Sequence, residues 1–448
     1  MRSDLPKVLH AVGDRPILSH VIDAARTLGP TRIHVVVGHG GEQVRSAMEA
    51  MYPDSESWLN WARQEKQNGT GHAVLQALPG VGPQSRCMVL VGDVPLVDPI
   101  DLEKLLQTES DLCLLTATPS NPSGLGRILR NTAGELVGIV EERDASAKER
   151  KIGEINTGIM LCGAESLDRW LAQVGCSNQQ GEYYLTDIVG IAVAEGSRVC
   201  GVVAATADRL LGINSRSDLA VAERGFRRLC TEALMAAGVT LKDPERVDIR
   251  GDVRFGRDCE VDVNVLLEGD VSVGDNVVIE PGCIIRNSRI GDFCHIYPNT
   301  LIEDAVLGNH CSVGPFARLR PETTLADHVR IGNFVETKKS EFGKGAKANH
   351  LAYVGDSSVG ENTNIGAGVI TCNYDGANKH RTEIGADVFV GSDSQLVAPV
   401  RIADGVTIGA GSTITRNIDH PVLVLSRAKQ LAVPGWDRPQ KKPPTEKT

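Results

Sequence analysis

The sequence predicts two structural parts, an α/β domain with a mostly parallel sheet and then a parallel β-helix of six-residue repeats. Three observations predict this order. Short apolar runs alternate with helix-period segments over residues 1–212, one apolar-sided segment spans 217–237, and a six-residue period runs from Phe255 to Ile414. The length of 448 residues also exceeds what a single hydrophobic core normally fills.

The α/β prediction rests on the alternation of strand and helix patterns along the first half. We expect strands at Ile33–Val37, Met88–Val91, Leu112–Thr116 and Ile155–Leu161. We expect helices at Gln43–Met51, Thr70–Leu78, Asp101–Gln107 and Leu167–Gln173. This order is typical of a doubly wound, Rossmann-like sheet, in which ligands bind at the carboxyl ends of the strands.

Two glycine-containing segments follow expected strands, and a third opens an expected helix. Gly92-Asp93 comes directly after one, where Asp93 offers a hard oxygen ligand for a metal, although an aspartate there can also cap a helix. Gly38–Gly41 fits neither dinucleotide nor Walker spacing, so we interpret it as a strand-to-helix turn. Gly69 and Thr70 open a helix, whose amino terminus favours a phosphate or a base edge.

The segment after the α/β domain predicts a connecting helix. Leu219, Phe226 and Leu229 give it one apolar side, and Gly238 is placed to end it. The expected boundaries are a first domain at 1–212, a linker helix at 213–238, a repeat domain at 239–433 and a disordered Pro-rich tail at 434–448.

The repeat is informative where its period slips. The period loses one residue after Ile285, Ile302, Thr337 and Val354, and gains seven after Thr371. The numbers of hexads between slips are six, three, six, three, three and six, which are all multiples of three. A prism with three flat faces tolerates insertions only where a coil closes, so 27 hexads predict nine coils of a left-handed parallel β-helix. At the spacing of paired strands it would be about 43 Å long.

Composition excludes several functional classes. The chain has 47 Lys and Arg against 57 Asp and Glu, and its net charge of −10 argues against nucleic-acid binding through overall charge. The 11 cysteines include no C-x-x-C pair, which favours neither zinc nor a disulfide framework and suggests a reduced cytoplasm. We find no apolar run near the roughly 18 residues of a membrane span, and no signal-peptide core at the start.

Polar residues within the repeat indicate chemistry beyond a structural role. Arg318, Arg320, Lys338, Lys339, Lys344 and Lys347 supply positive charge in the part of the repeat that contains His350, and Tyr353 follows three residues later. Cations beside an imidazole suit an anionic substrate, such as a sugar phosphate, that must meet a general base. The insertion Cys372–His380 is rich in turn residues, and we expect it to reach a neighbouring prism.

These motifs together resemble a known family. The segments Ser3–Lys7, Gly69–His72, Gly92-Asp93, Gly126-Arg127, Glu154–Gly158 and Gly181–Asp187 are similar to those of sugar nucleotidyltransferases. With Arg320-Pro321, Asn333–Lys338, His350–Tyr353 and Thr371–Lys379, the chain resembles the bifunctional N-acetylglucosamine-1-phosphate uridyltransferase/glucosamine-1-phosphate N-acetyltransferase family from residue 3 to about Trp436. The resemblance implies acetyl transfer from acetyl-CoA to glucosamine 1-phosphate, then uridylyl transfer from UTP with release of pyrophosphate.

The resemblance also implies residue roles. His350 would be the catalytic base of acetyl transfer. The sugar phosphate would be held by Arg320, Lys338, Tyr353, Asn364 and Lys379, and acetyl-CoA would contact Ala367, Asn373, Tyr374, Ser392, Ala410 and Arg427. For uridylyl transfer, Mg²⁺ would bind Asp93 and Asn214, and the substrate residues would be Lys7, Gln64, Gly69, Thr70, Gly92, Gly126, Glu141 and Asn156. The resemblance further implies a cytoplasmic homotrimer with sites between prisms.

The chain departs from this family at one point. The family's first strand and Gly-rich phosphate loop have no counterpart before Lys7. Omitting a central strand leaves its neighbours' backbone groups unpaired, each at a cost of about 1–3 kcal/mol. We therefore expect either that the natural chain begins upstream of Met1 or that uridylyl transfer is impaired while acetyl transfer survives.

Three other functions remain open from the sequence. The chain could be an acetyltransferase only, another sugar-1-phosphate nucleotidyltransferase with a structural β-helix, or a protein whose prism only assembles copies. Another nucleotidyltransferase would not need His350, Tyr353 or the Asn373–Lys379 loop, and a prism that only assembles copies would release no CoA. Release of CoA with glucosamine 1-phosphate, and its loss on changing His350 to Ala, separates them from the first interpretation.

Overall fold

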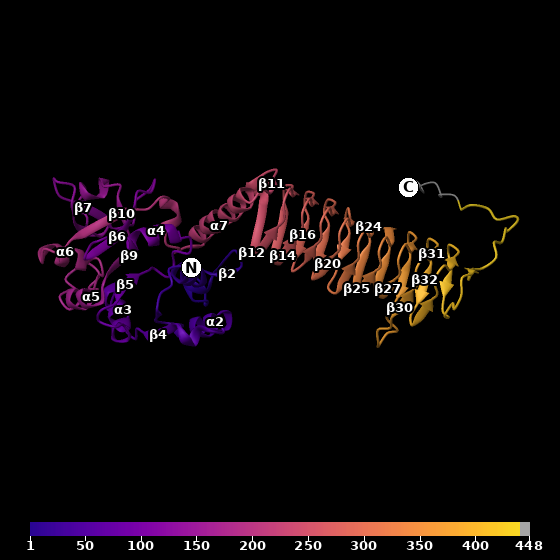
Figure 1. Ribbon diagram of the computed structural model, residues 1–448, viewed down its shortest axis with the longest axis horizontal. Coiled ribbons are helices and arrows are strands. Elements are labelled where there is room, and N and C mark those ends of the chain that lie inside the picture. Colours follow the sequence, from indigo (N-terminus) through magenta and orange to yellow (C-terminus); the bar gives the residue numbers. More distant parts are fainter. Residues whose placement is uncertain (440–448) are drawn as a thin grey trace, which may run out of the picture. The chain divides into compact units, whose positions relative to one another are not determined.

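The computed structural model of the chain describes residues 1–439 and divides into two compact units, Met1–Cys230 and Thr231 onward. The division falls inside the longest helix, α7 (Arg216–Ala236), which ends before Gly238 as expected (Figure 1). The other helices are α1 (Ile17–Arg26), α2 (Gly41–Met51), α3 (Thr70–Ala77), α4 (Pro99–Leu106), α5 (Ala164–Leu171) and α6 (Asp187–Ala194). Residues 440–448 of the tail expected to be disordered lie outside the described residues.

The first unit is an α/β unit whose sheet is split. β3 (Ile33–Val37) pairs only with β4 (Leu59–Arg63), in parallel. A separate six-stranded sheet has the order β10-β6-β9-β7-β8, with β5 also pairing β9. Its strands are β5 (Arg86–Val89), β6 (Leu112–Ala117), β7 (Arg127–Arg130), β8 (Leu136–Val140), β9 (Ile155–Gly163) and β10 (Val199–Val203), and a small hairpin joins β1 (Ala11–Val12) to β2 (Arg15–Pro16).

The split is a difference from the continuous doubly wound sheet that the pattern predicts. Every residue of β6 is buried because the strand has neighbours on both edges and helices on both faces. In β3 only Val35 is fully buried, and no residue of β5 is. Within residues 1–439, β3 and β5 each keep one edge without a strand partner.

The expected turn at Gly38–Gly41 is confirmed. Gly40 has φ +72° and precedes the first residue of α2, and a Cβ on Gly40 would lie 2.9 Å from the Pro6 ring. A side chain at that position would be strained by both the backbone angle and the contact.

The second unit is a parallel β-solenoid in which each rung hydrogen-bonds to the next. One sheet contains β11 (Thr240–Leu241), β13 (Glu260–Val261), β15 (Val278–Ile279), β18 (His295–Ile296), β21 (Ser312–Val313), β24 (Arg330–Asn333), β26 (Lys347–His350), β28 (Asn364–Ile365), β31 (Phe389–Val390), β34 (Thr407–Ile408) and β36 (Leu423–Val424).

The other solenoid sheet has 15 strands and covers the remaining sides. These strands are β12 (Val247–Phe255), β14 (Val265–Val273), β16 (Ile284–Arg286), β17 (Arg289–Ile290), β19 (Leu301–Glu303), β20 (Ala305–Leu307), β22 (Arg318–Leu319), β23 (Thr323–Leu325), β25 (Glu336–Phe342), β27 (Tyr353–Val359), β29 (Ile370–Cys372), β30 (Thr382–Ile384), β32 (Gln395–Val397), β33 (Val400–Ile402) and β35 (Thr413–Ile414).

The strand register confirms the slips of the hexad period. Ile279 pairs with Ile296 and Ile296 with Val313, each 17 residues on, whereas Val313 pairs with Ile331, 18 residues on. Ile365 pairs with Val390, 25 residues on, which is one coil plus the seven inserted residues. Each repeat position predicted to point inward from Val261 to Ile414 is at most 5% exposed. The winding starts earlier than the period indicated, at β11, and continues to β36.

Corners of the solenoid use left-handed backbone. One corner stacks Asn299, Phe316, Phe334 and Leu351 in successive coils, with φ values between +47° and +58°. Asparagine tolerates this region better than other non-glycine residues, while bulky residues there are uncommon. The bulky side chains at this corner therefore suggest a role other than backbone geometry.

Candidate active sites

The first candidate site lies at the carboxyl end of β5, where three expected residues meet. Lys7 Nζ lies 2.5 Å from Asp93 Oδ2 and 3.0 Å from Asn214 Oδ1. Asp218 accepts bonds from the backbone N–H groups of Asn214 and Ser215, which fixes Asn214 at the start of α7. The helix-cap alternative for Asp93 is excluded, because Asp98 caps α4 by accepting from Ile100 N.

This arrangement fits a divalent cation. Asp93 Oδ2 and Asn214 Oδ1 both contact the ammonium nitrogen of Lys7. The two oxygens therefore lie close enough together to bind one cation. Mg²⁺ prefers oxygen ligands and is usually held by one or two protein groups plus substrate phosphates and water. Over residues 1–439 there is no group of three or more His, Cys, Asp or Glu side chains that could hold a metal without such a substrate.

The expected base-binding residues lie at the start of α3. Gln64 Nε2 donates to Gly69 O at 3.1 Å and lies 3.0 Å from His72 Nδ1. Gly69 has φ +107°, and a Cβ there would lie 2.6 Å from Tyr183 O, so only glycine fits. Thr70 Oγ1 accepts from Leu185 N and joins the helix start to the segment before α6.

The expected sugar-binding residues lie on β7–β9. Asn156 N donates to Gly126 O at 2.8 Å, and a Cβ on Gly126 would lie 3.3 Å from Glu141 Oε2. Thr186 Oγ1 donates to Glu141 Oε1, and burial raises the pKa of the Glu141 carboxyl. These three residues line one cavity of about 1770 Å³ together with Lys7, Thr70 and Gly92.

The second candidate site is a cluster of cations on the solenoid, which we call the cation cluster and define as Arg320, Lys338 and Lys379. Arg320 directly follows β22, and Lys338 lies within β25. They are on successive rungs, because Arg320 N donates to Thr337 O. Glu336 binds Arg320 Nη1 at 2.8 Å. The Lys379 ammonium lowers the pKa of Lys338, with a smaller contribution from Arg320. Cations placed so close together favour an anionic ligand.

Tyr353 and Asn373 lie next to the cation cluster. Asn373 Nδ2 donates to Tyr353 Oη at 3.3 Å and to Asp356 Oδ2 at 2.5 Å. Lys338 pairs with Gly355, two residues after Tyr353, in the β25–β27 register. Lys339 and Arg318, which the sequence grouped with these cations, instead bind Glu322 and Glu303.

His350 occupies the last position of β26. Its Nδ1 lies 2.7 Å from Asn333 Oδ1, on the rung below. Since an amide oxygen only accepts, this contact assigns the proton to Nδ1 and leaves Nε2 free to accept a proton. His350 lies on one side of the Leu351 corner and Tyr353 on the other, and within residues 1–439 of one chain no interaction joins His350 to the cation cluster.

The residues matched to acetyl-CoA contacts lie further along the solenoid. Asn364, which is expected at the sugar phosphate instead, belongs to β28, the rung after that of His350. Ala367 O accepts from Asp393 N, Ser392 O accepts from Gly411 N, and Arg427 Nη1 donates to Ala410 O at 2.7 Å. These contacts place the residues on consecutive coils.

The Cys372–His380 insertion projects from the solenoid beside β30 (Figure 1). Asp375 accepts from the backbone N–H groups of Ala377 and Asn378, and its other oxygen contacts His380 Nε2 at 2.7 Å. The Asn378 N–H, together with His380, holds the pKa of Asp375 well below its usual range. Tyr374 is 60% exposed on this loop.

Family models match both units. The MobA-like NTP transferase domain matches residues 1–152, the GMPPB C-terminal domain matches 249–342, and six bacterial transferase hexapeptide repeats match 381–416. The matches agree with an α/β nucleotidyltransferase unit and a hexapeptide solenoid.

Curated relatives extend over nearly the whole chain. The bifunctional protein GlmU of Aromatoleum aromaticum is 51% identical and covers 99% of this chain and 96% of its own length. Those of Azoarcus sp. and Marinobacter nauticus are 52% and 49% identical, each over 98% of this chain. The chain belongs to the family of bifunctional GlmU proteins. It is a bifunctional transferase with acetyltransferase and uridyltransferase activities in UDP-N-acetylglucosamine synthesis.

Some site residues are found only in the structure. Asn333 sets the His350 tautomer, and Asp218 holds Asn214. Asn333 was part of a recognised motif, but only the rung register reveals that it stacks on His350. The part of the chain that the structure describes contains no helix long and apolar enough to cross a membrane.

Proposed function

We propose that the solenoid carries acetyl transfer, with His350 as the base and the cation cluster as the phosphate-binding site. The contact that supports this most directly is His350 Nδ1–Asn333 Oδ1, because it leaves Nε2 unprotonated toward solvent. Nε2 takes a proton from the amine of glucosamine 1-phosphate. The amine nitrogen then forms a bond to the acetyl carbon, the carbon–sulfur bond breaks, and CoA leaves as the thiolate that receives a proton.

The cation cluster binds and orients the sugar phosphate in this proposal. Arg320, Lys338 and Lys379 supply three positive charges, and Tyr353 adds a hydroxyl beside them. Asn364 completes the sugar site, and acetyl-CoA lies along Ala367, Asn373, Tyr374, Ser392, Ala410 and Arg427. A correctly positioned base contributes roughly 10²–10⁴-fold to the rate.

We propose that the α/β unit carries uridylyl transfer at the cavity beside β5. A phosphate oxygen of N-acetylglucosamine 1-phosphate attacks the α-phosphorus of UTP, and the bond to the pyrophosphate oxygen breaks. Lys7 neutralises charge on the phosphates, Gln64, Gly69 and Thr70 hold the uracil, and Gly126, Glu141 and Asn156 hold the sugar. Mg²⁺ bound to Asp93 and Asn214 would neutralise further phosphate charge.

We propose a homotrimer, because an exposed apolar corner runs beside His350. Phe316, Phe334 and Leu351 are 51%, 56% and 61% exposed, and the two phenyl rings stack with their centroids 5.5 Å apart. A second copy covering this corner would place groups from another chain between His350 and the cation cluster. Light scattering should show a trimer that Leu351→Asp dissociates, whereas Val306→Asp, 47% exposed on β20, should not.

We place the protein in the cytoplasm. All eleven cysteines are free thiols, and several are buried in the solenoid interior. A reducing compartment keeps such thiols unpaired.

Paired variants test the assignment of the two activities. His350→Ala should lower kcat for CoA release by roughly 10²–10⁴-fold and leave pyrophosphate release unchanged. Asp93→Ala should have the reverse effect. His295→Ala changes a histidine on β18 of the same solenoid sheet, three rungs before the β26 rung of His350. It serves as the control and should alter neither activity. Loss of both activities in either variant, or of neither, would refute the assignment.

A further inference from the structure

One carboxylate beside the cation cluster has no role in the reaction described so far. Asp356 lies at a corner of the solenoid with φ +49°, a left-handed angle that aspartate adopts more readily than most residues. The Lys379 ammonium lowers the pKa of Lys338, and the nearby Asp356 carboxylate acts in the opposite direction. A carboxylate at this place repels a bound phosphate, so its charge alone does not favour substrate binding.

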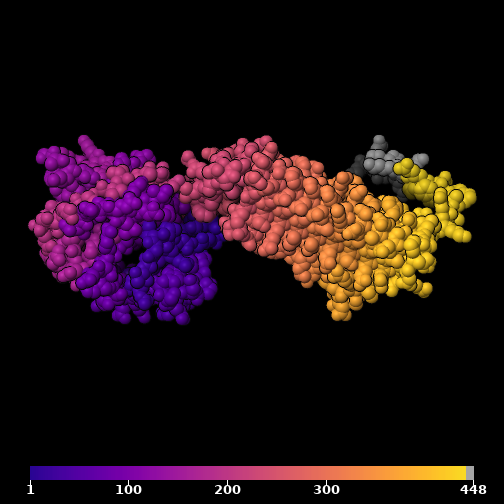
Figure 2. Space-filling view, in the orientation of Figure 1, coloured from indigo at the N-terminus to yellow at the C-terminus, as the bar shows by residue number. Residues whose placement is uncertain are grey.

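Asp356 contacts Asn373 at the base of the Cys372–His380 loop, which stands out from the solenoid surface (Figure 2). Asn373 is 7% exposed, and its Nδ2 donates to Asp356 Oδ2 at 2.5 Å. An ionised carboxylate only accepts hydrogen bonds, so it determines which end of the Asn373 amide faces it. The amide nitrogen, and not the amide oxygen, therefore lies on the side of Asp356.

The orientation of the Asn373 amide in turn determines the hydrogen-bonding role of Tyr353. Asn373 Nδ2 also lies 3.3 Å from Tyr353 Oη. An amide nitrogen cannot accept a hydrogen bond, so Tyr353 Oη is the acceptor and keeps its own hydrogen for another group. Within residues 1–439 the Tyr353 hydroxyl donates to no protein acceptor.

The position of the Tyr353 ring is set by the backbone beside it. A Cβ on Gly355 would lie 2.4 Å from Tyr353 Oη, so the hydroxyl end of the ring lies against Gly355. Gly355 pairs with Lys338 in the β25–β27 register, which brings the hydroxyl to the cation cluster. With the ring placed in this way, the direction of one O–H bond is what Asp356 controls.

We propose that Asp356 is a positioning residue for the phosphate of the sugar substrate. By fixing the Asn373 amide, it makes Tyr353 a hydrogen-bond donor to a phosphate oxygen at the cation cluster. Without a group that only accepts, the amide can turn and present its oxygen, and Tyr353 then donates to Asn373 instead. This inference rests on the proposed function, which places the phosphate at the cation cluster.

Asp356→Asn tests the sign of the effect. Asparagine has a similar size and adopts the same backbone angle, but its amide can donate as well as accept. The KM for glucosamine 1-phosphate, measured by CoA release, should rise roughly 10-fold. The kcat should stay the same, because contacts to the remote phosphate are made equally before and in the transition state. Loss of the negative charge alone would lower KM, so an unchanged or lower KM refutes the inference.

Asp304→Asn is the matched control. Asp304 is exposed and occupies the same corner three coils earlier, with φ +44°. It lies before the rungs that carry the cation cluster, so neither KM nor kcat should change. A rise in KM equal to that of Asp356→Asn would show a general effect of the corner and would refute a specific role.

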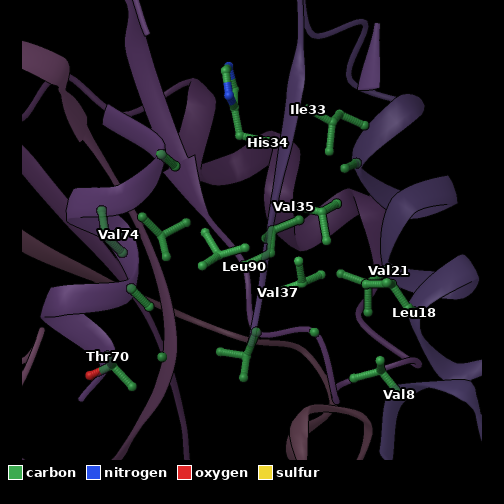
Figure 3. Close-up of a pocket in the computed structure, with 18 of the residues that line it drawn as sticks. Val8, Leu18, Val21, Ile33, His34, Val35, Val37, Thr70, Val74 and Leu90 are labelled. Atoms are coloured by element: carbon green, nitrogen blue, oxygen red, sulfur yellow. The ribbon is translucent and has the colours of Figure 1, made fainter. Parts of the chain in front are cut away.

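The α/β unit supplies an internal reference for each preparation. Every residue that lines its cavity belongs to residues 1–186, including Val35 and Thr70 (Figure 3). None of them lies in the solenoid, so hydrogen exchange of segment 33–37 should be the same in every variant.

A double-mutant cycle with Tyr353→Phe decides whether Asp356 acts through the Tyr353 hydroxyl. Tyr353→Phe should raise KM by roughly 10–100-fold, and Asp356→Asn should raise it no further in that background. An equal rise in both backgrounds would mean that Asp356 only supports the loop, which refutes the inference. If Tyr353→Phe raises KM and Asp356→Asn does not, the inference alone fails. If Tyr353→Phe leaves KM unchanged, the proposed phosphate site fails and the inference fails with it.

Discussion

The solenoid and the α/β unit differ in how completely their strands are paired. In the solenoid every inward position from Val261 to Ile414 is at most 5% exposed, and each rung pairs with its neighbours. In the α/β unit, β3 and β5 leave edges open to a cavity of about 1770 Å³. In a repeat, each coil needs only the two neighbouring coils to pair its backbone groups. In a mixed sheet, the backbone pairing of a strand depends on central strands that come from distant parts of the sequence.

The largest expected effect is on solenoid register. One alanine inserted between Ile365 and Gly366 falls inside a face and shifts the inward residues of that coil to the outside. We expect loss of the folded solenoid and of CoA release. The same insertion between Asp375 and Gly376 falls in the loop where seven residues are already accommodated, and circular dichroism should show an intact solenoid. Tolerance of the first insertion would contradict the three-sided winding.

A smaller effect compares matched valines in the two units. Val313 is 0% exposed in the solenoid, and Val313→Ala removes two methyl groups and leaves a cavity, so it should lower the free energy of unfolding by about 2–3 kcal/mol. Val37 borders an existing cavity, so Val37→Ala should cost less than about 1 kcal/mol. Denaturant titration with pulsed hydrogen exchange reports each unit separately. Equal costs would mean that the cavity beside Val37 is filled in solution.

The smallest expected effect concerns pH and the Cys372–His380 loop. Backbone N–H groups depress the pKa of Asp375 from its usual 3.8, so the ionised form stabilises the loop at neutral pH. This stabilisation is present above pH 3.8 and is lost as pH falls through the depressed value. The protection of loop amides relative to their intrinsic exchange rate at each pH should fall as the pH drops below 3.8, and Asp375→Ala should show the lower protection already at pH 7. A loop insensitive to both changes would contradict this assignment.

The sequence predicted the solenoid well and the α/β unit less completely. Slips after Ile285 and Thr371 translate directly into strand register, because each coil repeats the same geometry. The first coil was missed because β12 (Val247–Phe255) alternates every two residues and lacks the Gly-containing hexads. In the α/β unit, α1 and β4 were not predicted, although Gly13, Pro16 and Gly29-Pro30 flank α1 in the sequence.

The candidate sites show the same limit. The motif residues Lys7, Asp93 and Asn214 do converge, although they are more than 80 residues apart in sequence. His350 was expected beside the cations, and in one chain the Leu351 corner separates them. A hexad pattern specifies which residues face inward, but not which outward side chains lie around the same corner once copies assemble.

The central claim is that the two units carry separate activities and that the acetyltransferase site forms where copies of the solenoid meet at the Leu351 corner. The most direct test assays CoA release and pyrophosphate release in the same preparation of Leu351→Asp, with Val306→Asp as the control. We predict that Leu351→Asp lowers CoA release by roughly 10²-fold or more and leaves pyrophosphate release unchanged. Unchanged CoA release in the dissociated Leu351→Asp variant would contradict the account.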